Sequence, residues 1–313
     1  MTKATFIYIG ILFFVTPLSF YFKNDLTMET QFLIAGPVLL VLGIPHGAID
    51  NVLYRSERKM SDVRFVTIYL LGVGGIFFFW WFVPKLTYLS FLLISAYHFG
   101  QSQFSHYFKQ LKMLNRFLFW FWGIAILAAL ILFNDRELSS LAANSKEFGR
   151  IHISHISLVR IVFGLSSACT LFLLTYFTLR KQLRREHLFM ELLTLVLLLV
   201  TFYTLPFLIG FTLYFVVLHA LKVMNEEYCF LKSIGYVKEL RSFIKLLSPF
   251  SIVSMVGIIV VFILTQLKWI DLPFSYLLLI IISAITIPHA VVMDHFYALL
   301  FRKKFYAKNR IAY

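Results

Sequence analysis

The chain has 313 residues, of which 60% are hydrophobic and only 14% are charged, whereas an ordinary soluble domain has about 25% charged residues. Several stretches of about 18 to 25 residues lack any charge, which is long enough to cross a bilayer as a helix. The composition therefore excludes a soluble globular protein and indicates a polytopic helical membrane protein. The net charge of +14 is explained by basic loops beside the lipid surface, so no role in nucleic-acid binding is expected.

The apolar stretches predict about ten membrane-spanning helices within a single integral-membrane domain, residues 1–313. Only the turn around Leu205 and Pro206 separates the seventh span from the eighth, so a count between eight and ten fits the pattern. The expected fold class is an all-α transmembrane helical bundle. In chain order the spans cover roughly 5–22, 31–48, 65–83, 86–105, 117–133, 157–179, 188–204, 206–224, 246–267 and 274–300.

Basic residues lie mainly in the loops that follow the even-numbered spans, which is typical of cytoplasmic loops. Arg55 and Arg64, for example, follow the second span, and a lysine- and arginine-rich tail follows the tenth. We therefore expect a multi-pass protein of the cell (inner or plasma) membrane with both termini in the cytoplasm. The opposite loops hold only Lys23, Lys85, Arg136, Lys146, Arg150 and Lys268.

Four histidines lie inside expected spans, where polar side chains are costly and often functional: His46, His98, His219 and His289. Their spans all run inward from the outer face, and each histidine lies about 12 to 15 residues from the outer boundary, or roughly 18 to 22 Å deep. Four imidazoles in one layer are what a metal site in a bundle core requires. The alternative for each ring alone is a hydrogen bond to a neighbouring helix.

Two acids accompany the first and last of these histidines. Asp50 follows His46 by four residues and can face the same interior, whereas Asp294 follows His289 by five and is less well aligned. Carboxylates in such positions can orient metal-bound imidazoles; the alternative is an acid exposed at a helix end. A proline directly precedes both histidines, which removes a helix hydrogen bond and can kink the span.

The sequence resembles the Brp/Blh family of integral-membrane β-carotene 15,15′-dioxygenases, which are found alongside microbial rhodopsins. The first two of the four matching blocks are quite specific, and all four occur in the family's order. The blocks are GIPHGAIDNVLY (43–54), SAYHFGQSQF (95–104), LHALKVM (218–224) and TIPHAVVMD (286–294).

The resemblance implies a non-heme Fe(II) enzyme that uses O2 to cleave the central double bond of β-carotene into two molecules of all-trans retinal. His46, His98 and His219 match the family's ligand positions, and His289 is a further candidate for metal binding and catalysis. The resemblance also implies β-carotene uptake from the lipid bilayer and a functional link to a microbial rhodopsin. An apolar tunnel would be lined by Phe77, Phe78, Phe79, Trp80, Trp81, Phe211, Tyr214 and Phe215.

Two positions depart from the family pattern. The third block usually has two histidines four residues apart, but Val223 stands at the second position. Either His289 completes the metal site, or three histidines and water suffice, or the activity has changed or been lost. The family also tends to have an acid shortly after its second block, where Gln101 and Gln103 stand here.

Other functions remain open at the level of sequence. A catalytically silent relative that binds a carotenoid or retinal would have the same blocks. A histidine-lined transporter would usually show broken helices in matching halves, and apart from the paired IPH motifs the sequence shows no such symmetry. Desaturase-type enzymes have repeated HxxxH or HxxHH boxes, which are absent from this sequence.

Overall fold

The computed structural model describes residues 3–22, 25–55, 60–108, 112–152 and 155–302, which are almost entirely helical and contain no strand. This confirms the predicted all-α class. The uninterrupted long helices are α1 (Lys3–Tyr21), α4 (Asp62–Phe82), α5 (Pro84–Phe104), α6 (Met113–Phe133), α9 (Ile156–Leu179), α10 (Arg185–Thr204), α13 (Leu240–Gln266) and α14 (Phe274–Arg302).

Two of the predicted spans change helix type along their length. The second consists of α2 (Met28–Val38), the π-helix η1 (Leu39–Gly43), the 3₁₀-helix η2 (Ile44–Gly47) and α3 (Asp50–Arg55). The eighth consists of α11 (Phe207–Leu213), the π-helix η4 (Tyr214–Ala220) and α12 (Leu221–Ser233). Short π-helical segments are rare and often occur at functional sites.

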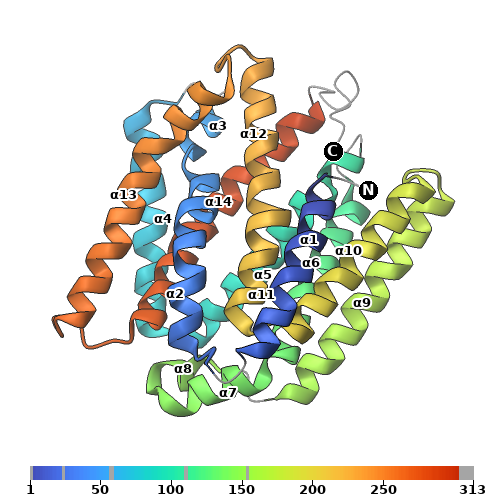
Figure 1. Ribbon diagram of the computed structural model, residues 1–313. Coiled ribbons are helices and arrows are strands. Elements are labelled where there is room, and N and C mark those ends of the chain that lie inside the picture. The colour runs from blue at the N-terminus through green and yellow to red at the C-terminus, as the bar shows by residue number, and fades with distance from the viewer. Residues whose placement is uncertain (1–2, 23–24, 56–59, 109–111, 153–154, 303–313) are drawn as a thin grey trace.

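Nine helices of the described part of the chain are long and apolar enough to cross a membrane. The one remaining predicted span, the fourth, corresponds to α5, which is as long as its neighbours but has polar residues in its C-terminal half, including buried Ser95, His98, Gln101 and Ser102. Because these side chains face protein, the low apolarity of α5 does not conflict with a place in the bundle. Figure 1 shows that α1 begins and α14 ends on the same side of the bundle, as an even number of crossings requires.

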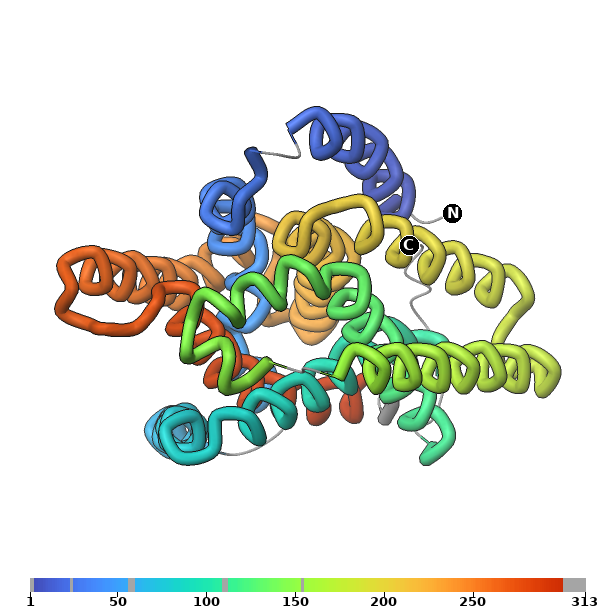
Figure 2. The backbone as a smooth tube through the Cα atoms, turned by 90° about the horizontal axis from the view of Figure 1, so that it is seen from below, coloured from blue at the N-terminus to red at the C-terminus, as the bar shows by residue number. Residues whose placement is uncertain are grey.

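The segment from α11 to α12 runs through the middle of the bundle, between α2, α5 and α14 (Figure 1). It is the most buried of the candidate spans, at 61%. Figure 2 shows α9 and α13 at opposite edges, and the short helices α7 (Asp135–Asn144) and α8 (Lys146–Ile151) across one end of the bundle. The α7 helix is fixed there by Glu137, which accepts a hydrogen bond from Gln31 Nε2 at 3.0 Å.

Two glycines allow α5 and α6 to pack backbone against backbone. A Cβ atom added at Gly100 would lie 1.9 Å from the carbonyl oxygen of Phe119, and one added at Gly123 would lie 1.8 Å from that of Ala96. Close approach through small residues is a common way to pack helices in membranes, where apolar side chains gain little by leaving lipid. Gly100 belongs to the YHFG block, so this contact fixes the helix that bears His98.

Candidate metal centre

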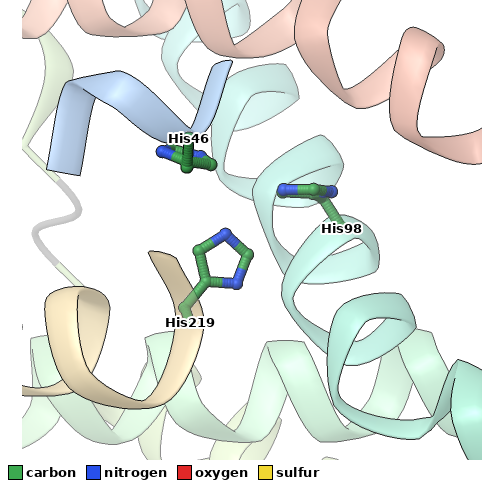
Figure 3. A group of neighbouring side chains, drawn as sticks. All are labelled: His46, His98 and His219. Carbon is green, nitrogen blue, oxygen red and sulfur yellow. The ribbon is translucent and has the colours of Figure 1, made fainter. Parts of the chain in front are cut away.

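Four histidine side chains from four segments meet inside the bundle. His46 comes from η2, His98 from α5, His219 from η4 and His289 from α14. The candidate ligand nitrogens of the first three lie within 4.8 Å of one another, and Figure 3 shows these rings around a common space. The His289 ring lies beside them, its centroid 4.8 Å from that of His46 and 5.1 Å from that of His98. The structure therefore brings together all four histidines that the sequence indicates.

Two of the rings are oriented by oxygen atoms that can accept a hydrogen bond from Nδ1–H. The Nδ1 of His46 bonds the carbonyl oxygen of Gly43, which can only accept, so this nitrogen bears the hydrogen. The Nδ1 of His289 lies 2.8 Å from Oδ1 of Asp50. A neutral imidazole protonated at Nδ1 has its free lone pair on Nε2. Both rings therefore present Nε2 as a potential metal ligand.

The orientation of His219 follows from a chain of two hydrogen bonds. Its Nδ1 lies 2.9 Å from the hydroxyl oxygen of Ser102. That hydroxyl donates its own hydrogen to the carbonyl of Phe99, also at 2.9 Å, so it accepts from the imidazole. His219 is therefore protonated at Nδ1 as well, and its Nε2 lone pair is free.

The free nitrogens are buried. Among the described residues, the Nε2 atoms of His98, His219 and His289 have no hydrogen-bond partner, and neither has Nδ1 of His98. A buried polar atom without a partner costs about 1–3 kcal/mol, so several in one place would be a considerable penalty. A metal ion that accepts these lone pairs removes the penalty, and imidazole nitrogen suits iron as well as zinc, copper and nickel. The donor set therefore fits an iron ion.

The backbone around His46 departs from an α-helix because of its proline. Pro45 cannot donate a hydrogen bond and its ring crowds the preceding turn. The helix first widens into a π-helical turn, in which the N–H of Ile44 bonds the carbonyl of Leu39. It then narrows into the 3₁₀-helical turn that includes His46. In contrast, α14 continues as an α-helix through Pro288.

His219 lies within the π-helical segment η4. The N–H of Leu221 bonds the carbonyl of Val216, five residues earlier, which widens the turn that includes the histidine. The ring stacks on Phe215 at a centroid distance of 5.4 Å and meets Phe99 edge-on at 4.8 Å. Apolar side chains therefore cover part of the His219 ring.

Glycines of the first block make room for the neighbouring rings. A Cβ atom at Gly47 would lie 3.3 Å from Nδ1 of His289, and one at Gly43 would lie 3.0 Å from the Phe215 ring. Both distances are shorter than ordinary van der Waals contact. The glycines of GIPHG thus allow the end of η1 to approach η4 and η2 to approach α14.

The two acids have different partners. Asp50 bonds His289, not the histidine of its own block, and also accepts a hydrogen bond from the Tyr69 hydroxyl at 3.2 Å. Asp294 accepts hydrogen bonds from Tyr97 at 3.1 Å and from Gln101 at 2.7 Å, both on α5. Asp50 therefore orients a histidine ring directly, whereas Asp294 supports the helix that bears His98. Gln101, which stands near the position where the family tends to have an acid, binds an acid from α14.

Val223 is fully buried in the hydrophobic core, so the position that usually has a histidine in the family provides packing here. Five other histidines lie outside the four-ring cluster, and three of them pack against aromatic side chains. Their rings contact tyrosines: His106 and His187 contact Tyr107, and His295 contacts Tyr54. His152 and His155 lie at the ends of α8 and α9.

The predicted aromatic tunnel is wrong for α4. Phe77, Phe78, Phe79 and Trp81 are exposed on the surface of the bundle, and Trp80 is buried in a separate cluster with Tyr276. The aromatic residues of the eighth span do lie near the histidines, since the Phe215 ring is 5.3 Å from that of His46.

Sequence reasoning missed Ser102 and Tyr69. Ser102 follows His98 by four residues, so its place on the inner face of α5 could have been read from the helical period. Tyr69 is separated from Asp50 by 19 positions and belongs to another helix, and no pattern in the sequence indicates that contact.

These features define an integral-membrane class: an all-α bundle with apolar, membrane-length helices around a buried histidine cluster. Residues 38–297 match the family described as beta-carotene 15,15′-dioxygenase, and the chain belongs to that family. A curated relative with that name, from an uncultured marine bacterium (66A03), is 32% identical over 80 residues, which is 24% of this chain and 29% of the relative. The match therefore spans less than a third of the relative's length. No solved structure matches the chain.

Proposed function

We propose that the chain is an Fe(II)-dependent dioxygenase that cleaves the central 15,15′ double bond of β-carotene. The observation that supports this most is the meeting of His46, His98 and His219, whose candidate ligand nitrogens lie within 4.8 Å of one another, in a chain of this family. The reaction consumes one O2 and places one oxygen atom on each carbon of the broken double bond. Its products are two molecules of all-trans retinal.

The histidines have distinct roles in this proposal. His46, His98 and His219 hold the iron, and His289 provides a fourth nitrogen in place of the one that Val223 cannot supply. Bound iron supplies the redox chemistry that activates O2. The protein's contribution is to fix the rings and limit water: Asp50 keeps the proton of His289 on Nδ1, Ser102 does the same for His219, and Phe99 and Phe215 cover the His219 ring.

The hydrocarbon substrate favours a site inside a membrane. β-Carotene partitions into lipid, so a site within the bundle can receive it from the bilayer of the cell membrane. The proposed product, retinal, is the chromophore of microbial rhodopsins, which gives the proposed functional link to such a protein.

The test is to produce the chain in bacteria that make β-carotene and to analyse the pigments by liquid chromatography. The proposal predicts bleaching and two retinals for each β-carotene lost, and neither with the His98→Ala variant. If folded, iron-loaded chain gives no bleaching and no retinal, the proposal is wrong.

A second candidate is a silent relative that binds a carotenoid or retinal, because Val223 replaces a histidine of the family pattern. In that case the purified chain would retain pigment without cleaving it, even when iron is supplied. A transporter has less support. The two interrupted spans are the second and the eighth, which are not matching positions in two halves of a ten-span chain.

A further inference from the structure

An apolar groove lies between α4 and α14. Its volume is about 280 Å³, and it is partly open to the surface of the bundle. On α4 its lining residues follow one helical face, with spacings of three and four: Phe65, Ile68, Tyr69, Gly72 and Ile76. Ile76 follows Phe65 by eleven positions, so the lined face of α4 is about 16 Å long. A lined face of that length suits a rod-like hydrocarbon.

The groove opens on the side that faces lipid. Ile68 is 53% exposed and Val291, on the facing helix, is 64% exposed, and both line the groove. Gly72 stands in the middle of the α4 face. A Cβ atom there would lie 3.4 Å from the Pro288 ring, so the missing side chain at Gly72 leaves the groove open beside Pro288.

The inner wall of the groove adjoins the histidine cluster. Pro288, which lines the groove, directly precedes His289 in the chain. Tyr69, which also lines it, donates a hydrogen bond to Asp50, and Asp50 holds the His289 ring. The groove is therefore connected to His289 in two ways, through the adjacent Pro288 in the chain and through the hydrogen bonds from Tyr69 to Asp50 and from Asp50 to His289.

We propose that this groove holds one end ring and the adjoining polyene of the carotenoid substrate. This inference rests on the proposed function and adds a binding place to it. Pockets for whole drug-sized ligands are about 300–1,000 Å³, so the groove is suited to one arm of a C40 molecule. Its lining is almost entirely apolar, which suits an arm without any polar group.

The test uses the full chain in phosphatidylcholine nanodiscs. The nanodiscs are loaded with β-carotene in the absence of O2 and then repurified, and empty nanodiscs give the background. The measurement is β-carotene retained per chain. Gly72→Leu fills the groove and is expected to lower retention about tenfold, equivalent to about 1.4 kcal/mol. Gly74→Leu is the matched control, because Gly74 is on the same helix and has nothing within 4 Å of an added Cβ.

Two further variants separate blocking from misfolding. Gly72→Ala adds only the Cβ that fits beside Pro288 and is expected to retain most of the pigment. Val291→Trp fills the same groove from the exposed side of α14 and is expected to lower retention as Gly72→Leu does.

The inference would be overturned if Gly72→Leu retained as much β-carotene as the wild type. It would also be overturned if Gly72→Leu and Gly74→Leu lost β-carotene to the same extent. A third contrary result would be that Gly72→Leu loses bound phospholipid, as measured by native mass spectrometry, while its β-carotene retention is unchanged. The groove would then hold lipid. If the wild-type chain cleaves β-carotene and Gly72→Leu has no effect on retention or cleavage, only the groove assignment fails. If the wild-type chain neither retains nor cleaves it, the proposed function fails as well.

Discussion

Asp50 and His289 are 239 positions apart in the chain, yet their side chains are hydrogen-bonded at 2.8 Å inside the bundle. Both are buried, and each belongs to an IPH block at opposite ends of the sequence. The two blocks are thus two walls of one site, in which the acid of the first holds the histidine of the second. A carboxylate that accepts a hydrogen bond from Nδ1–H of a histidine makes Nε2 of that ring a better metal ligand.

Asp50→Asn is expected to weaken iron binding by about 10- to 100-fold, because the neutral amide no longer stabilises the proton on Nδ1 of His289. The measurement is the iron affinity of the purified chain, by competition with a chelator. Glu191→Gln is the matched control. Glu191 is also a buried carboxylate with two side-chain hydrogen bonds, to Gln103 and Tyr107. An equal loss in both variants would contradict a specific role for Asp50.

Gly100→Ala is expected to destabilise the fold by about 1–3 kcal/mol, because the new methyl group overlaps the Phe119 carbonyl and forces α5 and α6 apart. The measurement is the midpoint of thermal unfolding in detergent. Gly74→Ala, which meets nothing within 4 Å, should leave that midpoint unchanged or raise it slightly, since alanine favours a helix. A normal midpoint for Gly100→Ala would mean that the two backbones are not in contact.

Val223→His is expected to leave iron affinity unchanged or lower it. His289 already provides a fourth nitrogen in our proposal, and the larger ring would overpack a position that is fully buried. Iron titration of this variant beside the wild type is the measurement. A clear gain in affinity would show that the family's usual fourth position is the better ligand and that His289 is not one.

Ser102→Ala is expected to lower iron affinity less than Asp50→Asn. It removes a neutral acceptor at Nδ1 of His219, and such a hydrogen bond contributes only about 0.5–1.5 kcal/mol. The iron titration used for Asp50→Asn gives the comparison. If Ser102→Ala lowered iron affinity more than Asp50→Asn does, the expected order of the two effects would be wrong.

Much of the fold could be predicted from the sequence because lipid imposes a simple rule: a span needs about 20 apolar residues. All ten predicted spans correspond to helices in the structure. The histidines could be selected by the same rule, since they interrupt apolar stretches at a similar depth. Counting residues from the span boundaries was enough to place them in one layer.

Contacts between spans could not be predicted in this way. The partner of Asp50 depends on how α14 is rotated against α3, and hydropathy says nothing about rotation. The π-helical turn before Leu221 has no proline to indicate it. The aromatic run of α4 resembled a tunnel wall in sequence, but the structure places most of it on the outer surface, because α4 presents the side that bears Gly72 to α14.

The central claim is that the histidine cluster holds iron, and the most direct test is metal analysis of the purified chain by mass spectrometry. The account predicts a single iron per wild-type chain and almost none in folded His219→Ala, because His219 is one of the three histidines whose candidate ligand nitrogens lie within 4.8 Å of one another. Wild-type chain that folds without binding iron, or a His219→Ala variant that retains it in full, would contradict the account.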